Sequence, residues 1–166
     1  MNKKINRISI VSYGRKGSKR CPNKLLRKFN KTTIVDILLS KLSNFDNSYF
    51  GGYDYEFKNK CKKHKVNFIQ RTKKSVSIDY PIMDALDFMR NLNSEYILLI
   101  NGCLPFLSIE TINEFLKFVK KNKYAPASAV TLKSNYFFDK NFKPLNFTNR
   151  LKTLNTKNVE EIYEYA

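Results

Sequence analysis

The chain has 166 residues, of which 42% are hydrophobic, so it is long enough to bury one core, and a single domain over residues 1–166 is expected. Its 31 Lys and Arg residues outnumber 14 Asp and Glu, and the resulting charge of +17 favours anionic partners such as nucleoside triphosphates, nucleic acids or anionic membranes, although dispersed lysines are also typical of a solvated surface. Three cysteines, an odd count without a CxxC pair, suggest neither a disulfide framework nor a cysteine-rich zinc site.

Strand-like and helix-like segments alternate along the chain. In the first half, the predicted elements are a strand at Ile5–Val11, a helix from Thr33, a strand at Tyr49–Tyr53, a helix at Asp54–Lys63 and a strand at Val66–Gln70. In the second half, they are a helix capped by Asp79 or Tyr80, a strand at Glu95–Ile100, a helix from Ser108 and a strand at Ala127–Leu132. Repeated strand–helix units predict a three-layer α/β/α sandwich with a mostly parallel sheet.

Several local signals support these elements. Thr33 and Asp36 form a capping-box-like start, and Pro81 fits the first turn of a helix carrying Ile82, Ala85, Leu86 and Met89 on one face. The run Glu95–Ile100 is the most apolar, which predicts a central strand buried on both faces beside Ile5–Val11.

Metal and membrane signals are weak. Cys61 and His64 offer at most two ligands, too few for zinc, and His64 is expected at the surface at the end of a lysine-rich helix. The N-terminal apolar run is too short for a signal peptide and no stretch could span a bilayer. A cytoplasmic setting without a membrane partner is therefore expected.

The loop within Val11–Lys24 carries the strongest functional signal. It follows the apolar run Ile8–Val11 and holds two glycines and five cations. Glycines allow close backbone approach or positive φ, and cations beside backbone N–H groups can cradle phosphate oxygens. The loop matches neither a Walker motif nor GxGxxG. Charge and glycine content alone leave open a phosphate-binding loop or a solvated basic turn.

The motif from Arg15 to Arg20, followed by Pro22-Asn23-Lys24, resembles the signature of acylneuraminate cytidylyltransferases (CMP-sialic acid synthetases), Arg-x-Gly-Ser-Lys-Arg and a following lysine. These share a nucleotidyltransferase superfamily with the 3-deoxy-manno-octulosonate cytidylyltransferases. Four further stretches agree in order and spacing: Gly52-Tyr53-Asp54, Arg71 to Asp79 with the helix after it, Ile97 to Leu107, and Ala127 to Thr131. The resemblance covers essentially the whole chain.

The resemblance implies an enzyme that transfers CMP from CTP to an acidic, sialic-acid-like sugar with release of pyrophosphate, for lipopolysaccharide or capsule synthesis. It implies catalytic roles for Arg15, Lys19 and Lys24. The nucleotide-binding residues it implies are Gly14, Gly17, Ser18, Arg20, Asn23, Arg71, Ser77, Asp79 and Asn101. Asn101 stands where the family has glutamine, and both amides offer a donor and an acceptor. No nucleic-acid partner is expected.

The chain departs from the family at the metal site. No carboxylate follows the central strand at Asn101-Gly102-Cys103, where the octulosonate branch has a metal-binding Asp, and the sialic acid branch takes its metal carboxylates from a segment near the C-terminus. The resemblance thus implies a Mg²⁺ cofactor with ligands beyond Ala166, a C-terminally truncated chain with little activity, and a homodimer at full length. Asp54, Asp79 and Asp84 are expected to serve as helix caps or surface residues. The alternatives are an inactive nucleotide-binding module and a basic nucleic-acid-binding protein.

Overall fold

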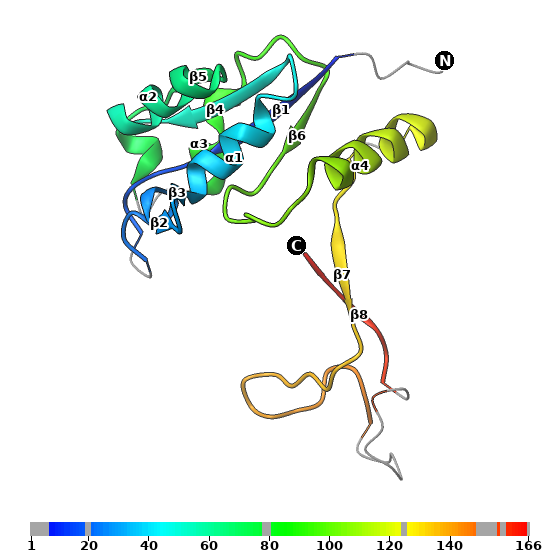
Figure 1. Cartoon of the computed structure of the whole chain (residues 1–166). Coiled ribbons are helices and arrows are strands. Elements are labelled where there is room, and N and C mark those ends of the chain that lie inside the picture. The colour runs from blue at the N-terminus through cyan, green and yellow to red at the C-terminus, as the bar shows by residue number, and fades with distance from the viewer. Residues whose placement is uncertain are drawn as a thin grey trace. The chain divides into compact units, whose positions relative to one another are not determined.

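The computed structural model describes residues 7–18, 21–77, 81–123, 126–148, 156 and 159–165 (Figure 1). The chain divides into two compact units, Met1–Lys123 and Tyr124–Ala166. Each unit has its own strands, and the expectation of a single domain stays a prediction. Within the described ranges, no helix is both long enough and apolar enough to cross a membrane.

A four-stranded parallel sheet organises the first unit. Its strands, from one edge to the other, are β5 (Asn67–Gln70), β4 (Ser48–Gly52), β1 (Ile8–Tyr13) and β6 (Tyr96–Leu99). β1 is an interior strand because it pairs in parallel with both β4 and β6. The first predicted strand is therefore confirmed from residue 8 onward, while residues 5 and 6 lie outside the described ranges.

Helices cover one face of this sheet. They are α1 (Ile34–Leu42), α2 (Tyr55–His64) and α4 (Ile109–Asn122) (Figure 1). These helices contribute Leu39, Phe57 and Ile112 to a buried cluster that also holds Ile10 of β1 and Phe50 of β4. Burial of such apolar side chains is the main favourable term in folding.

The opposite face of the sheet is covered by the segment between β5 and β6. Neighbouring side chains of a strand point to opposite faces, so Gly51 of β4 faces away from the cluster that holds Phe50. The ring of Phe88 lies directly over Gly51. Layers on both faces of a parallel sheet confirm the predicted α/β class.

Two helix starts follow the sequence signals closely. Thr33 is the N-cap of α1, and its hydroxyl oxygen accepts a hydrogen bond from the backbone N–H of Asp36 at 3.3 Å. Ser108 caps α4 in the same way, accepting from the N–H of Thr111 at 3.1 Å. Both contacts satisfy a backbone donor that the first helical turn leaves unpaired.

The predicted position of the most apolar strand is wrong in part. β6 pairs with β1, as expected for neighbours, but it lies at an edge of the described sheet. Ile97 and Leu99 are 39% and 41% exposed, so the strand is not buried on both faces. A continuous apolar run indicates that a segment forms a strand. How deeply that strand is buried depends on whether a second strand pairs with it, which its own sequence does not specify.

The helix predicted after Pro81 is much shorter than expected. α3 spans only Ile82–Ala85, with Pro81 at its N-cap position, and a 3-10 turn, η3 (Asp87–Met89), follows it. The N–H of Leu86 bonds to both Ile82 O and Met83 O, which tightens the last turn. The predicted caps, Asp79 and Tyr80, lie outside the described residues.

The second unit contains an antiparallel pair, β7 (Val130–Lys133) and β8 (Ile162–Tyr165). β7 confirms the strand predicted at Ala127–Leu132, although it begins and ends later in the chain than predicted. The strand β8 was not predicted. Buried Asn146 ties the unit together, since its side-chain amide donates to Asn135 O and Glu160 O, both at 2.8 Å. Ring contacts among Tyr136, Phe138 and Phe147 form a small aromatic cluster.

Candidate nucleotide site

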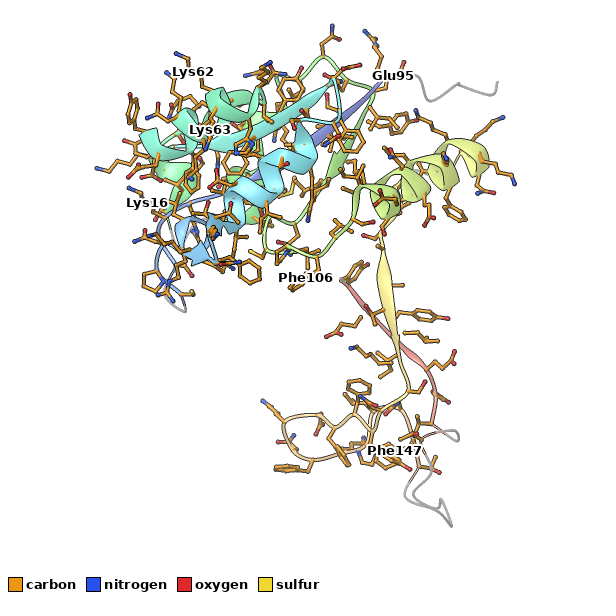
Figure 2. The ribbon with its side chains drawn as sticks, in the orientation of Figure 1. Lys16, Lys62, Lys63, Glu95, Phe106 and Phe147 are labelled. Atoms are coloured by element: carbon orange, nitrogen blue, oxygen red, sulfur yellow. The ribbon has the colours of Figure 1, made fainter. Side chains whose placement is uncertain are left out.

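Three loops at the carboxyl ends of parallel strands carry the predicted nucleotide-binding residues. They comprise residues 14–23 after β1, 71–77 after β5 and 101–107 after β6. In α/β proteins this edge of the sheet is where ligands bind. Figure 2 shows Lys16 on the first loop and Phe106 on the third. Three predicted site residues, Lys19, Arg20 and Asp79, lie outside the described residues.

Gly14 is required for packing rather than for an unusual backbone angle. The sequence suggested that a glycine in this loop allows either a close backbone approach or a positive φ. None of the described glycines has a positive φ, so the second reason does not apply to them. A Cβ on Gly14 would lie 2.5 Å from Leu25 Cδ1 and 2.9 Å from Phe50 Cζ. The loop therefore packs closely against the core where it leaves β1, and a side chain at position 14 would displace either the loop or these core side chains.

The loop after β1 is closed by its own hydrogen bonds. Asn23 adopts the left-handed conformation (φ 54°, ψ 27°) that asparagine tolerates. Its N–H donates to Lys16 O at 3.1 Å, and its carbonyl accepts from Leu26 N at 2.8 Å. Ser18 Oγ accepts from the N–H of Cys21 at 3.3 Å. Asn23 and Ser18 thus shape the loop in addition to the ligand contacts predicted for them.

Other predicted residues of this loop remain accessible. Gly17 is exposed, and Lys24 is half-buried at the start of a 3-10 turn, η1 (Lys24–Leu26), that buries the Leu25 side chain. Lys16 pairs with Glu56 of α2 at the surface. The hydrogen bond to Glu56 raises the pKa of Lys16 above its ordinary value.

Arg15 connects the loop after β1 to the loop after β5. Its Nη1 donates to Ser77 O and lies 3.5 Å from Val76 O. Two predicted nucleotide-site residues from separate loops, Arg15 and Ser77, are therefore in direct contact. The Arg15 side chain is half-buried, so a ligand that offers better acceptors than these carbonyls can reach it.

Arg71 lies beneath the same loop and is 2% exposed. Its Nη1 donates to Gly14 O at 3.3 Å, and its Nη2 donates to Ser75 O. The guanidinium carbon lies 5.1 Å from the ring centroid of Tyr13 and 5.6 Å from that of Phe88. Burial lowers the pKa of Arg71 below its ordinary value. The residue predicted to line the nucleotide pocket is thus a buried cation at the root of the glycine loop.

Asn101 follows β6 at the same edge of the sheet and is exposed. Its Oδ1 accepts from the N–H of Cys103 at 3.0 Å, which folds the loop back on itself. A Cβ on Gly102 would lie 3.2 Å from Leu38 Cδ2 and 3.3 Å from Ser12 Oγ, so the loop runs close to β1 and α1. The cytosine contact expected of Asn101 stays a prediction.

Sequence reasoning missed Tyr13 and Phe88, whose rings lie against the Arg71 guanidinium, and Gly51, over which the Phe88 ring lies. Tyr13 ends β1 and could have been noted because it directly precedes the glycine loop. No sequence pattern pointed to a role for Phe88, since it falls outside the apolar face of the helix predicted around it.

No group of three or more His, Cys, Asp or Glu side chains that could hold a metal ion occurs among the described residues. Asp54 is the N-cap residue of α2 and Asp84 lies in α3. Burial raises the pKa of the Cys61 thiol to about 12. His64 is not the free surface residue expected, because its side chain is 20% exposed and its Nε2 lies 3.0 Å from Asp36 Oδ1.

A parallel α/β sheet with a cation-rich glycine loop after its first strand is the arrangement in which many α/β proteins bind nucleotides. The model of the cytidylyltransferase family matches residues 10–165, so the chain belongs to this family. Comparison with curated proteins gives no match.

Solved structures support the fold. A cytidylyltransferase from Leptospira borgpetersenii serovar Hardjo-bovis superposes with a TM-score of 0.58 at 20% identity, over 70% of this chain and 50% of that one. A CMP:2-keto-3-deoxy-manno-octonic acid synthetase complexed with CTP gives 0.63 at 13% identity, over 95% and 71%. The 4-diphosphocytidyl-2C-methyl-D-erythritol synthase of Anaerococcus prevotii gives 0.57 at 14% identity, over 99% and 70%. The chain therefore spans half the length of the first of these proteins.

Proposed function

We propose that this protein transfers CMP from CTP to a sialic-acid-like sugar acid and releases pyrophosphate, in the cytoplasm, for surface glycan synthesis. Membership of the cytidylyltransferase family supports the use of CTP. The acidic acceptor rests on the motif from Arg15 to Lys24, and one structural neighbour is itself named for the synthesis of a CMP-linked octonic acid.

The observation that carries the proposal is the joining of two predicted nucleotide-site loops by two arginines. Arg15 reaches from the loop after β1 to Ser77, and Arg71 reaches from the loop after β5 to Gly14. Both guanidinium groups lie at the carboxyl edge of the sheet. Positive charge and backbone N–H groups held together at this edge are suited to bind phosphate oxygens.

The chemistry requires positioning and charge neutralisation. A hydroxyl oxygen of the sugar forms a bond to the α-phosphorus of CTP, the bond from that phosphorus to the bridging oxygen breaks, and pyrophosphate leaves with the added negative charge. The hydroxyl proton passes to a base or to water. In the proposal Arg15, Lys19 and Lys24 bind the phosphates and offset the charge that develops on them.

A Mg²⁺ ion is part of the proposal because such an ion, when bound, would supply positive charge that offsets the charge on the phosphates. Magnesium takes oxygen ligands, usually including one or two carboxylates. The described residues offer no such cluster, so no step above depends on metal ligands within them.

The test is a pyrophosphate-release assay with CTP or ATP, Mg²⁺, and a panel of sugar acids that includes nonulosonic acids and 3-deoxy-manno-octulosonate. We expect CTP and a nonulosonic acid to be preferred. Binding is measured in parallel by titrating CTP and ATP at fixed salt. Equal, weak binding of both nucleotides that modest salt abolishes would indicate general charge attraction and contradict the proposal.

The absence of a metal-binding cluster from the described residues favours a second candidate, a nucleotide-binding module of the same fold without catalytic activity. CTP-selective binding without pyrophosphate release, for every acceptor tested, would support this alternative.

A further inference from the structure

Arg71 is a buried cation whose positive charge is not balanced by a described carboxylate. No described carboxylate forms an ion pair with it, and its Nε has no hydrogen-bond partner. Its other nitrogens are bonded to the carbonyl oxygens of Gly14 and Ser75. A buried charge is costly unless it is paired or well hydrogen-bonded. Among the described residues, neutral carbonyl oxygens and not carboxylates therefore accept the hydrogen bonds of Arg71.

Two aromatic rings supply the remaining contacts. Tyr13 and Phe88 face the guanidinium at 5.1 and 5.6 Å, and their own ring centroids are 6.2 Å apart at an interplanar angle of 56°. The negative face of an aromatic ring attracts a cation, more strongly when water is excluded. We call Tyr13 and Phe88 the aromatic bracket.

The bracket depends on the absence of a side chain at Gly51. Gly51 is the register partner of Tyr13 in the neighbouring strand, so the two positions share one face of the sheet. A Cβ on Gly51 would lie 2.4 Å from the Phe88 ring. The space left by this glycine is therefore where Phe88 reaches Arg71.

We propose that the aromatic bracket is a positioning device that fixes Arg71 under Gly14 as a positive charge without a carboxylate partner among the described residues, which favours a polyphosphate in the glycine loop. The identity of the polyphosphate as that of CTP rests on the proposed function. Arg71 acts through the carbonyl of Gly14 on the shape of the loop and through its charge on the ligand. A bound anion would supply the opposite charge that no described carboxylate provides to Arg71.

The test compares two variants that disturb the bracket with a matched control. Phe88→Leu removes one ring, and Gly51→Ala displaces it. Phe68→Leu is the control, because Phe68 is also half-buried and packs on the adjacent glycine, Gly52, with a Cβ-to-ring distance of 2.9 Å. The dissociation constants of inorganic tripolyphosphate and of CTP are measured on the full chain at fixed salt, together with the melting temperature without ligand.

We expect Phe88→Leu and Gly51→Ala each to weaken tripolyphosphate binding by about tenfold, whereas Phe68→Leu changes it less than about twofold. The double variant of Gly51 and Phe88 should be no worse than either single variant, because both disturb the same contact. The Arg71 Nε–H proton is shielded from water in the wild-type protein. Followed through its ¹⁵N-coupled signal, this proton should exchange rapidly with water in both bracket variants but not in the control.

The outcomes separate the two proposals. If tripolyphosphate affinity falls in the bracket variants while CTP is not preferred over ATP, the bracket is confirmed and the proposed use of CTP is wrong. If CTP binds selectively and the bracket variants bind like the control, the proposed function stands and the bracket is overturned. Wild-type protein that binds neither ligand would overturn both.

Discussion

Asp36 on α1 is the centre of a polar cluster that joins the start of α1 to α2. Its carboxylate accepts hydrogen bonds from Thr33 Oγ1 and Lys60 Nζ, both at 2.6 Å, and lies 3.0 Å from His64 Nε2. Burial alone would raise the pKa of Asp36, but the hydrogen bonds from Lys60, Thr33 and His64 outweigh it and lower the pKa to about 2. The ionised carboxylate is therefore stabilised in the folded protein.

Replacing this carboxylate by an amide should reduce stability in a pH-dependent way. The ordinary pKa is 3.8 and the folded-state value is about 2, and each unit corresponds to roughly 1.4 kcal/mol. Asp36→Asn should therefore lower the free energy of unfolding at pH 7 by ~2 kcal/mol. Because the folded-state pKa is depressed, this contribution is fully present above pH 4 and is lost as the pH falls from about 4 to about 2.

The assay is urea unfolding followed by circular dichroism between pH 7 and pH 2. Asp87→Asn is the control, since Asp87 pairs with Arg90 at the surface, where their side chains are 65% and 74% exposed. That exposed pair should contribute less than about 1 kcal/mol at any pH. A constant difference between wild type and Asp36→Asn over the whole pH range would refute the reasoning, because it would show that the charge of Asp36 does not produce the effect.

Three further predictions concern the site. Gly14→Ala should lower the free energy of unfolding by roughly 1–3 kcal/mol, measured by the same urea titration, because its Cβ would overlap Leu25 and Phe50; unchanged stability would contradict the packing described for this loop. Arg15→Ala and Lys19→Ala should weaken CTP binding on the order of tenfold or more while circular dichroism stays unchanged; loss of the fold would make their roles structural. Removing divalent metal with EDTA should abolish pyrophosphate release and leave tripolyphosphate binding in the glycine loop largely intact, and turnover that persists without metal would rule out the metal-assisted reaction.

The sequence predicted the elements whose signals are local. Thr33 and Asp36 define the start of α1 because a cap and its partner lie within one turn of each other. Ser108 acts in the same way for α4. The apolar run within β1, followed by glycines and cations, indicated both a buried strand and the loop that leaves it. In each case the energetic reason lies within a few residues along the chain.

The features that the sequence did not predict depend on contacts between distant segments. The exposed face of β6 reflects which strands lie beside it, and nothing within Tyr96–Leu99 encodes that. Likewise Phe88 is one phenylalanine among 13, and it gains a role only because Gly51, 37 positions earlier, leaves room for its ring above the sheet. A motif identifies the groups suited to touch a phosphate, such as Arg15. It does not identify the aromatic side chains that hold Arg71, because aromatic rings are common in cores and their contact with a cation is set by the fold.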